Sequence, residues 1–305
     1  MGPVIEGLRQ AARTLVREFR VVDGSGCIPG NTVPECHLLM ELESRGTATA
    51  SELAEIMLLE KSSMSRLINR LVTAGLVAAG RPGGDRRRRP LSLTELGREK
   101  VHEIHDRADD QVRRALAFVP DEAREGVLEG LQQYASALRY ARLSEAFHIR
   151  PIRSDDKAAM ARVIRDVMTE HGAVGCGYSI GDPEVNDMYT AYQGSGSAYF
   201  VVVDDHDEVL GGGGVGPLVG GDEEICELKK MYFMPQLRGK GMGLQLLRHC
   251  IHTARLLGYR RCYLETLDVM HQARHLYRKQ GFDDLDGPMG ATGHDACNRW
   301  MMREL

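Results

Sequence analysis

The stretch ELKKMYFMPQLRGKGMG, from Glu227 to Gly243, decides the fold of the second half of this 305-residue chain. Its first seven residues mix apolar and long side chains as a strand does, and Pro235 then ends ladder hydrogen bonding. Apolar residues recur at helical spacing from Leu244 to Ala254, and Gly258 is a natural helix stop. The sequence therefore predicts a strand, a glycine-rich turn and a helix in direct succession.

Such a turn offers an anion site, because unpaired backbone N–H groups meet there at the positive end of a helix dipole. Taken alone, it is equally consistent with a tight connection and nothing more. Two common nucleotide fingerprints do not fit. The Walker pattern needs Gly-Lys-Ser/Thr, and the dinucleotide turn needs a third glycine and a downstream acid.

The segment resembles motif A of the GNAT N-acetyltransferases, R/Q-x-x-G-x-G/A, through Arg238, Gly241 and Gly243. A second stretch, LETLDVMHQARHLYRKQGF at 264–282, resembles the family's later strand and helix that end in an LYxxxGF box. The resemblance covers about residues 148–305. It implies an α/β (α+β) fold with a central mixed sheet, acetyl-CoA as cofactor and a small primary amine as acceptor.

The resemblance also implies site residues. Glu227 matches a general base, although it is equally readable as a strand-end glutamate paired with Lys229 or Arg261. Tyr277 matches the general acid beside the sulfur rather than a simple core tyrosine. Cofactor contacts are expected from the backbone of Met231, Tyr232 and Phe233 and from Arg238, Gly239, Lys240, Gly241, Met242 and Gly243.

Two further features of this half bear on the site without assigning a role. Met270 stands where the family often has asparagine, which puts one expected cofactor contact in doubt. A glycine-rich segment at 287–300 is long enough to be functional, and its His294 either lines the acceptor pocket or caps a turn.

The first half shows helix starts in the pattern of capping boxes, at Thr32 to Glu35 and at Thr49 to Glu52. A short third helix, a turn and then SSMSRLINRLVTAG are typical of a helix-turn-helix DNA reader, although an ordinary amphipathic helix has the same period. The polar face predicted to contact DNA consists of Ser62, Ser63, Ser65, Arg66, Asn69 and Arg70.

A hairpin follows, with strands predicted at 76–81 and 89–93 and arginines at its tip. The string GDRRRRPLSLTELG resembles the wing of the MarR family of transcriptional regulators, whose D-x-R pattern is matched by Asp85 and Arg87. This resemblance implies that an arginine enters the minor groove of double-stranded DNA. The candidates are Arg86, Arg87 and Arg88.

Long helices are predicted after Thr94 and after Pro120, and an apolar stripe runs from Val4 to Phe19. A small winged domain does not need them to fill its core. MarR-like proteins use such helices to dimerise, so the resemblance implies a homodimer that binds a palindromic operator.

Composition is that of a globular protein, with 43% hydrophobic and 27% charged residues and a formal net charge of -4. No apolar run approaches the ~20 residues that span a bilayer, and the start has no apolar signal core, so we expect a cytoplasmic protein without a membrane partner. The seven cysteines form no C-x-x-C pair, and we expect no metal site.

These observations predict two domains. Residues 1–145 form a mainly α, MarR-like winged helix-turn-helix domain, and residues 146–305 form a GNAT acetyltransferase domain. The favoured function is a DNA-binding regulator fused to an acetyl-CoA-dependent N-acetyltransferase. Two alternatives stay open: a regulator whose second domain only senses acetyl-CoA or an amine, and an acetyltransferase whose winged domain only dimerises.

Overall fold

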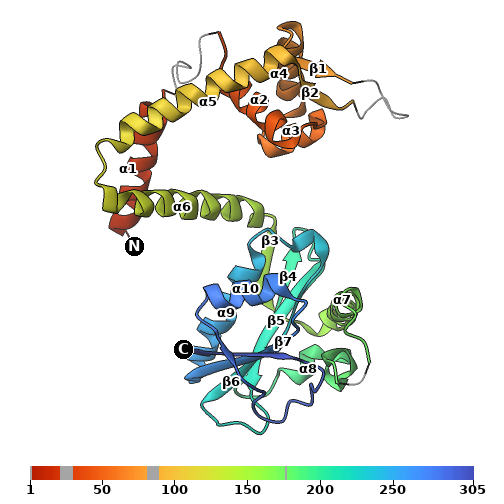
Figure 1. The fold of residues 1–305 in the computed structure, drawn as a ribbon. Helices are drawn as coiled ribbons and strands as arrows, with labels where there is room; N and C mark the ends of the chain where they lie inside the picture. The colour runs from red at the N-terminus through yellow and green to blue at the C-terminus, as the bar shows by residue number, and fades with distance from the viewer. Residues whose placement is uncertain (1, 21–29, 81–88, 176) are drawn as a thin grey trace. The chain divides into compact units, whose positions relative to one another are not determined.

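The computed structural model describes residues 2–20, 30–80, 89–175 and 177–305 (Figure 1). The chain divides into two compact units, Met1–Val127 and Leu128–Leu305. The division falls inside helix α6, Arg124–Ser144, whereas the predicted domain boundary at 145/146 follows the end of that helix.

The first unit contains the predicted helix-turn-helix and hairpin. Its core is built from buried residues of α2, α3, α4 and the first turns of α5, together with the base of the hairpin. Thr32 is the N-cap of α2, and its backbone N–H donates to the carboxylate of Glu35 at 2.8 Å. Thr49 is the N-cap of α3, and its backbone N–H donates to the carboxylate of Glu52 at 2.7 Å. The helices are α1 Gly2–Glu18, α2 Val33–Arg45, α3 Ala50–Ile56, α4 Lys61–Thr73 and α5 Glu95–Leu116.

The hairpin strands β1 (Val77–Ala79) and β2 (Leu91–Leu93) pair antiparallel, with Val77 opposite Leu93. This confirms the hairpin where the chain is described. Both strands are shorter than predicted, and the tip, residues 81–88, lies outside the described residues.

Among the described residues of the second unit, seven strands form one mixed sheet in the order β3-β4-β5-β6-β7-β9-β8. All neighbours are antiparallel except β6 and β7. The strands are β3 Phe147–Pro151, β4 Ala198–Asp204, β5 Val209–Pro217, β6 Ile225–Phe233, β7 Arg261–Thr266, β8 Asp283–Leu285 and β9 Arg299–Glu304.

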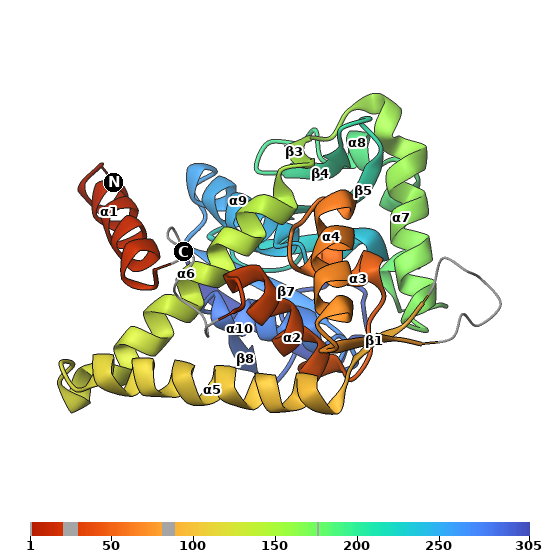
Figure 2. The same cartoon turned by 90° about the horizontal axis from the view of Figure 1, so that it is seen from above.

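Helices cover both faces of this sheet (Figures 1 and 2). Apolar residues of α9 and α10 form one buried cluster with the sheet, and α7 and α8 form another. Gly212 of β5 makes room for this packing, because a methyl group there would lie 2.7 Å from the sulfur of Met160 on α7. The helices are α7 Lys157–Glu170, α8 Met188–Ala191, α9 Met242–Leu256 and α10 His271–Lys279. The short helices are η1 Asp121–Ala123, η2 Ser154–Asp156, η3 Ser179–Gly181, η4 Pro183–Asn186 and η5 Pro235–Leu237.

The structure confirms the predicted fold class, a helical winged unit followed by an α/β unit with a mixed sheet. The sequence pattern does not predict β8, which has only three residues. Helix α1 forms over the predicted apolar stripe, yet none of its residues is buried in the described chain. No described helix is long and apolar enough to cross a membrane.

Candidate functional site

Strand β6 carries a bulge at the point where the sequence predicts acetyl transfer. Lys229 pairs with Gly214 and Tyr232 with Gly212, so Lys230 and Met231 together lie opposite one residue of β5. Lys230 has a φ of 51°, in the left-handed region that non-glycine residues seldom adopt. The bulge re-aims the strand over the following residues.

The edge of β6 that faces away from β5 has no strand partner after Glu227 in the described chain. Its parallel pairing with β7 ends at Glu227 and Tyr263, and no further pair joins the two strands in the described chain. The backbone from Met231 to Phe233 therefore has a strand partner, β5, on one side only, and the Phe233 carbonyl also accepts a hydrogen bond from Arg238. An extended ligand fits the open edge as an added strand would.

A cavity of about 60 Å³ lies beside this edge. Glu227 and Tyr277, the two predicted catalytic residues, both line it although they are 50 positions apart. Met231 and Tyr232 of β6, Glu265 of β7 and His294 also line the cavity. The structure thus brings the predicted base and acid to one site.

Glu227 is 3% exposed, and its Oε2 atom makes no hydrogen bond in the described structure. The Nζ atom of Lys229 lies 3.3 Å from this oxygen, so the pair is an ionic contact without hydrogen-bond geometry. Burial raises the pKa of Glu227, and Glu265 adds to the rise, while Lys229 and His294 oppose it. A buried carboxylate with a raised pKa and an oxygen that accepts no hydrogen bond is suited to take a proton.

Tyr277 is 7% exposed, and its ring packs against Phe282 with centroids 5.8 Å apart. Its hydroxyl lies 4.0 Å from the sulfur of Met231, a weak acceptor. Burial raises the pKa of Tyr277, so the phenol keeps its proton at neutral pH. The hydroxyl is thus a proton donor without a strong partner, next to the bulged strand.

The glycine turn leads into α9 as predicted. Gly239 and Gly241 have φ values of 71° and 81°, and Gly241 is the N-cap of the helix. Among the described residues, the backbone N–H groups of 239–244 have no hydrogen-bond acceptor. This run of free amides at a helix N-terminus can bind a pyrophosphate.

Two charged side chains of the turn, Arg238 and Lys240, contact other parts of the same chain. The guanidinium of Arg238 donates to both carboxylate oxygens of Glu170 at 2.5 and 2.6 Å, and its Nε donates to the carbonyl of Phe233 at 3.0 Å. Lys240 places Nζ 4.7 Å from the centre of the Phe147 ring. Arg238 therefore fixes the turn against β6 and α7.

Gly241 has a neighbour that the sequence does not indicate. A methyl group at this position would lie 2.8 Å from the Cβ atom of Tyr140 on α6. A substitution at Gly241 therefore disturbs α6 packing as well as any anion site, whereas Gly239 has open space around it.

A buried array of alternating charges lies next to the cavity, and the sequence pattern does not predict it. Lys230, whose side chain is 2% exposed, pairs with Asp182 and with Glu184. His294 pairs with Asp182 at 2.8 Å and with Glu265 at 3.3 Å. The sequence offers only a weak signal for this charge array. Of its members, only His294 is singled out there, either as a residue that lines the acceptor pocket or as the cap of a turn.

Met270, the departure from the GNAT pattern, is the N-cap residue of α10 and makes no side-chain capping bond. Its sulfur accepts a hydrogen bond from Thr266 at 3.8 Å, and the residue lines the cavity. It adds an apolar wall where asparagine would add polar groups.

In the first unit, α4 buries Met64, Leu67, Ile68 and Leu71, while Val72 is 39% exposed. The polar residues predicted to read DNA are exposed, except Ser63, which is half-buried. Arg66 donates to the hydroxyl of Ser63 at 3.2 Å.

Arg70 is tied to α2, because its Nε donates to the carboxylate of Glu35 at 2.8 Å. Burial raises the pKa of Glu35, but hydrogen bonds from the Thr32 backbone and Arg70 outweigh it, and the pKa is lowered overall. The wing candidates Arg86, Arg87 and Arg88 lie outside the described residues.

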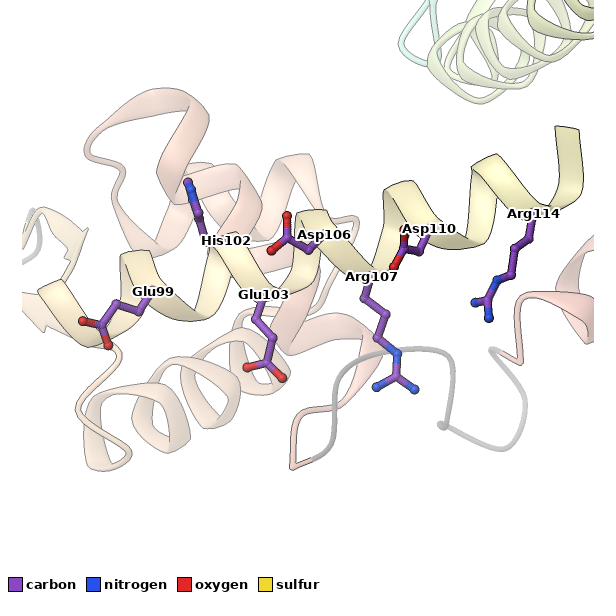
Figure 3. Close-up of a pocket in the computed structure, with 7 residues that line it drawn as sticks. All are labelled: Glu99, His102, Glu103, Asp106, Arg107, Asp110 and Arg114. Atoms are coloured by element: carbon purple, nitrogen blue, oxygen red, sulfur yellow. The ribbon is translucent and has the colours of Figure 1, made fainter. Parts of the chain in front are cut away.

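Figure 3 shows a shallow hollow along α5. All its lining side chains come from this one helix, and charges of both signs alternate along it. A solvated helix face explains this pattern, and we assign it no role. The lining residues are Glu99, His102, Glu103, Asp106, Arg107, Asp110 and Arg114.

Comparison with known proteins finds a family match in each half of the chain. Residues 166–282 match the acetyltransferase (GNAT) family, and residues 30–88 match the MarR family. The chain is 44% identical to the uncharacterized N-acetyltransferase YjgM of Escherichia coli, over 52% of this chain and 94% of that protein. It is 30% identical to the HTH-type transcriptional regulator FarR of Neisseria gonorrhoeae, over 34% of this chain and 70% of that protein. A solved GNAT acetyltransferase from Staphylococcus aureus aligns over 52% of this chain and 99% of its own, with 23% identity and a TM-score of 0.47.

Proposed function

Because this chain belongs to the GNAT acetyltransferase family and joins that domain to a MarR-type regulator domain, we propose that it binds operator DNA and also transfers an acetyl group from acetyl-CoA to a primary amine. We assign DNA binding and dimerisation to residues 1–145 and acetyl transfer to residues 146–305. A regulator acts where DNA is, so the proposed location is the cytoplasm.

The observation that carries the proposed chemistry is the shared cavity of Glu227 and Tyr277 beside the open edge of β6. The amine nitrogen attacks the thioester carbonyl, and Glu227 takes the proton that the nitrogen loses. The carbon–sulfur bond breaks, and Tyr277 donates its proton to the departing sulfur. The raised pKa of Glu227 makes its carboxylate a stronger base, and the raised pKa of Tyr277 keeps its phenol protonated.

The residues present fit acetyl-CoA. The free amides of 239–244 suit the pyrophosphate, and the open backbone edge at 231–233 suits the amide-bearing pantetheine arm. When bound, acetyl-CoA supplies the activated acetyl group. We propose Met231, Tyr232, Phe233 and residues 238–243 as the contact set.

The acceptor is proposed to be a small molecule or amino acid with a primary amine, because the cavity of about 60 Å³ admits only a small reacting end. Its buried acids, Glu227 and Glu265, favour an approaching ammonium over an anion.

For DNA, we propose that the exposed face of α4 enters the major groove and that a wing arginine enters the minor groove. The exposed side chains of this face that make no contact with a buried acid are Ser62, Ser65, Arg66 and Asn69. Arg70 must leave Glu35 or contact DNA with its remaining N–H groups.

Two experiments test the proposal. The first is a screen for thiol release from acetyl-CoA against amino acids, polyamines and aminoglycosides. Release with at least one amine supports turnover, whereas acetyl-CoA binding without release from any amine favours a sensor.

The second experiment measures DNA affinity against salt concentration. Arg86→Ala with Arg87→Ala should weaken binding and flatten the slope of log K against log salt by roughly one unit for each phosphate that the variant no longer neutralises. An unchanged affinity and slope would remove the wing from the interface, as expected if the winged domain only dimerises.

A further inference from the structure

The closing segment, residues 287–298, is held over the cavity by hydrogen bonds to parts of the chain far away in sequence. The segment is bonded to strand β7, to Asp268 in the turn after that strand, to the segment before η3 and to the loop after β5. The bonds are Met289 N–H to the Tyr263 hydroxyl at 3.1 Å, Thr292 to Glu265 at 3.1 Å, Ala296 N–H to the Gly177 carbonyl at 3.2 Å, Ala291 N–H to the Val219 carbonyl at 2.6 Å and Asp268 N–H to Asn298 at 2.8 Å.

His294 is the one side chain of this segment that bridges two carboxylates on different elements of the described chain. Its Nε2 lies 2.8 Å from Asp182 at the start of η4, and its Nδ1 lies 3.3 Å from Glu265 on β7. The side chains of His294, Asp182 and Glu265 are 11%, 27% and 3% exposed. Asp182 and His294 are 112 positions apart in sequence.

The Nε2 contact with Asp182 has hydrogen-bond geometry and the Nδ1 contact with Glu265 is an ion pair, and together they favour a doubly protonated ring. A neutral imidazole has one N–H and can donate to only one of the two carboxylates, whereas an imidazolium donates to both. The hydrogen bonds to Asp182 and then Glu265 raise the pKa of His294 to about 9, against burial and the charge of Lys230. With both nitrogens engaged, the ring has no lone pair to act as a base.

Other charges surround the bridge. Lys230 pairs with Asp182 and Glu184 on the η4 side. Glu227 on β6 interacts electrostatically with His294. Cys297 of the closing segment interacts electrostatically with Glu265, Lys230 and Glu227. Removing the proton of His294 would leave Asp182 and Glu265 with one donor to share and would add to the negative charge of the pocket.

We propose that His294 is a positioning residue that clamps the closing segment onto η4 and β7 and thereby shapes the acceptor side of the cavity. The clamp does not touch the glycine turn, so it governs the acceptor and not acetyl-CoA. The kinetic part of the proposal rests on the proposed acetyl transfer, and the structural part does not.

The structural test is amide hydrogen exchange of the full chain at pH 7. In His294→Gln, the Ala296 amide should exchange faster by about tenfold or more, the order expected from losing a charge-assisted bridge. His206→Gln, in an exposed turn between β4 and β5, is the matched control and should leave this amide unchanged. Equal protection of Ala296 in all three proteins would overturn the clamp.

The kinetic test uses any amine that the screen identifies. In His294→Gln, the acceptor KM should rise about tenfold while the acetyl-CoA KM stays within about twofold. The ratio of wild-type to variant kcat/KM cancels the ionisation of the amine itself. This ratio should fall toward one as pH rises through about 9, because the clamp is present while His294 is protonated and is lost above that pKa. A ratio that does not change with pH, or an equal rise in both KM values, contradicts the clamp.

The outcomes separate the two proposals. If no amine is acetylated but Ala296 loses protection in His294→Gln, acetyl transfer fails and the clamp stands. If turnover occurs and Ala296 is unaffected, the clamp fails and acetyl transfer stands.

If His294→Gln does not fold, the wild-type ring is followed by NMR. A titration midpoint near pH 9 supports the bridge, and one near 6.5 overturns it.

Discussion

Glu227 is placed at a cost to stability, and this separates a catalytic role from a structural one. Burial raises its pKa, so the contribution of the carboxyl is greatest below its usual value of 4.5 and is lost as pH rises through the raised pKa. The carboxyl group is buried, and its Oε2 has no hydrogen bond in the described structure. This pattern is the one expected if Glu227 is the proposed base, and its pairing with Lys229 is the structural alternative that the next prediction tests.

We predict that Glu227→Gln lowers turnover by about 100-fold to 10,000-fold, the range of general base catalysis, with part of the loss recovered at higher pH as more amine is already deprotonated. The thermal midpoint at pH 7.5 should equal or exceed that of the wild type, because a neutral amide avoids burying a charge. Steady-state kinetics and thermal unfolding check the two statements. A lower midpoint together with normal turnover would mark Glu227 as a structural partner of Lys229.

The pairing of Glu227 with Tyr277 could be predicted from the sequence, because the resemblance of the two motifs to the GNAT family implies a role for each at one site. The clamp around His294 could not. Asp182, Glu265 and His294 meet through loops whose paths depend on tertiary packing, and no local period relates positions 112 apart. The sequence indicates only an ordinary strand residue at Lys230. The bulge there could not be predicted, because the alternation of apolar and polar residues along the strand does not reveal it.

At the scale of elements, the turn before α9 offers a test of anion binding that changes charge and almost nothing else. Gly239 has a positive φ and open space, and both aspartate and asparagine tolerate this backbone region. We predict that Gly239→Asp binds acetyl-CoA at least about tenfold more weakly than Gly239→Asn, because only the first adds a negative charge at the free amides. Calorimetry checks this, and equal affinities would move the pyrophosphate away from the turn.

Helix α4 combines the surface proposed to contact DNA with a structural tie to α2. Because the pKa of Glu35 is lowered, its ion pair stabilises the fold above pH 4.5, and this stabilisation is lost as pH falls. We predict that Arg70→Ala costs about 1 kcal/mol at pH 7, near the range of surface pairs since Arg70 is 58% exposed, and that the difference shrinks on acidification.

Arg66→Ala is the matched control for this prediction, because Arg66 contacts only Ser63 among the described residues. Denaturant unfolding at pH 7 and pH 4 measures both variants. Equal losses of stability in the two, or a loss in Arg70→Ala that does not vary with pH, would show that the Glu35 tie contributes nothing.

The elements themselves were largely predictable. Capping patterns at Thr32 and Thr49 mark helix starts that the structure confirms, because these signals are local hydrogen bonds. Short elements were less predictable, because helix α8 has only four residues and strand β8 only three, too few to show a period. Both depend on contacts with the rest of the sheet and its loops.

For the whole molecule, the helices outside the winged core leave large apolar side chains exposed. On α1, Val4, Ile5 and Leu8 are 66%, 53% and 42% exposed, and α6 exposes Leu128, Leu131 and Leu138 at 49 to 56%. Neither helix buries a residue in the described chain. Apolar surface of this extent is typical of a subunit interface.

We predict that the protein has twice the mass of one chain by light scattering, and that Ile5→Glu with Leu8→Glu shifts it to the monomer. Arg13→Glu places the same charge on the polar face of α1 and should leave the dimer intact. A wild-type monomer at micromolar concentration would contradict the proposed dimer.

The most direct test of the central claim, acetyl transfer at the Glu227 and Tyr277 cavity, compares thiol release by the wild type and Tyr277→Phe. The substitution keeps the ring that packs on Phe282 and removes only the hydroxyl. We predict turnover by the wild type with at least one primary amine, a decrease of about 100-fold to 10,000-fold in the variant, and an unchanged acetyl-CoA affinity. Equal turnover in the two proteins, or acetyl-CoA binding by the wild type with no thiol release from any amine, would contradict it.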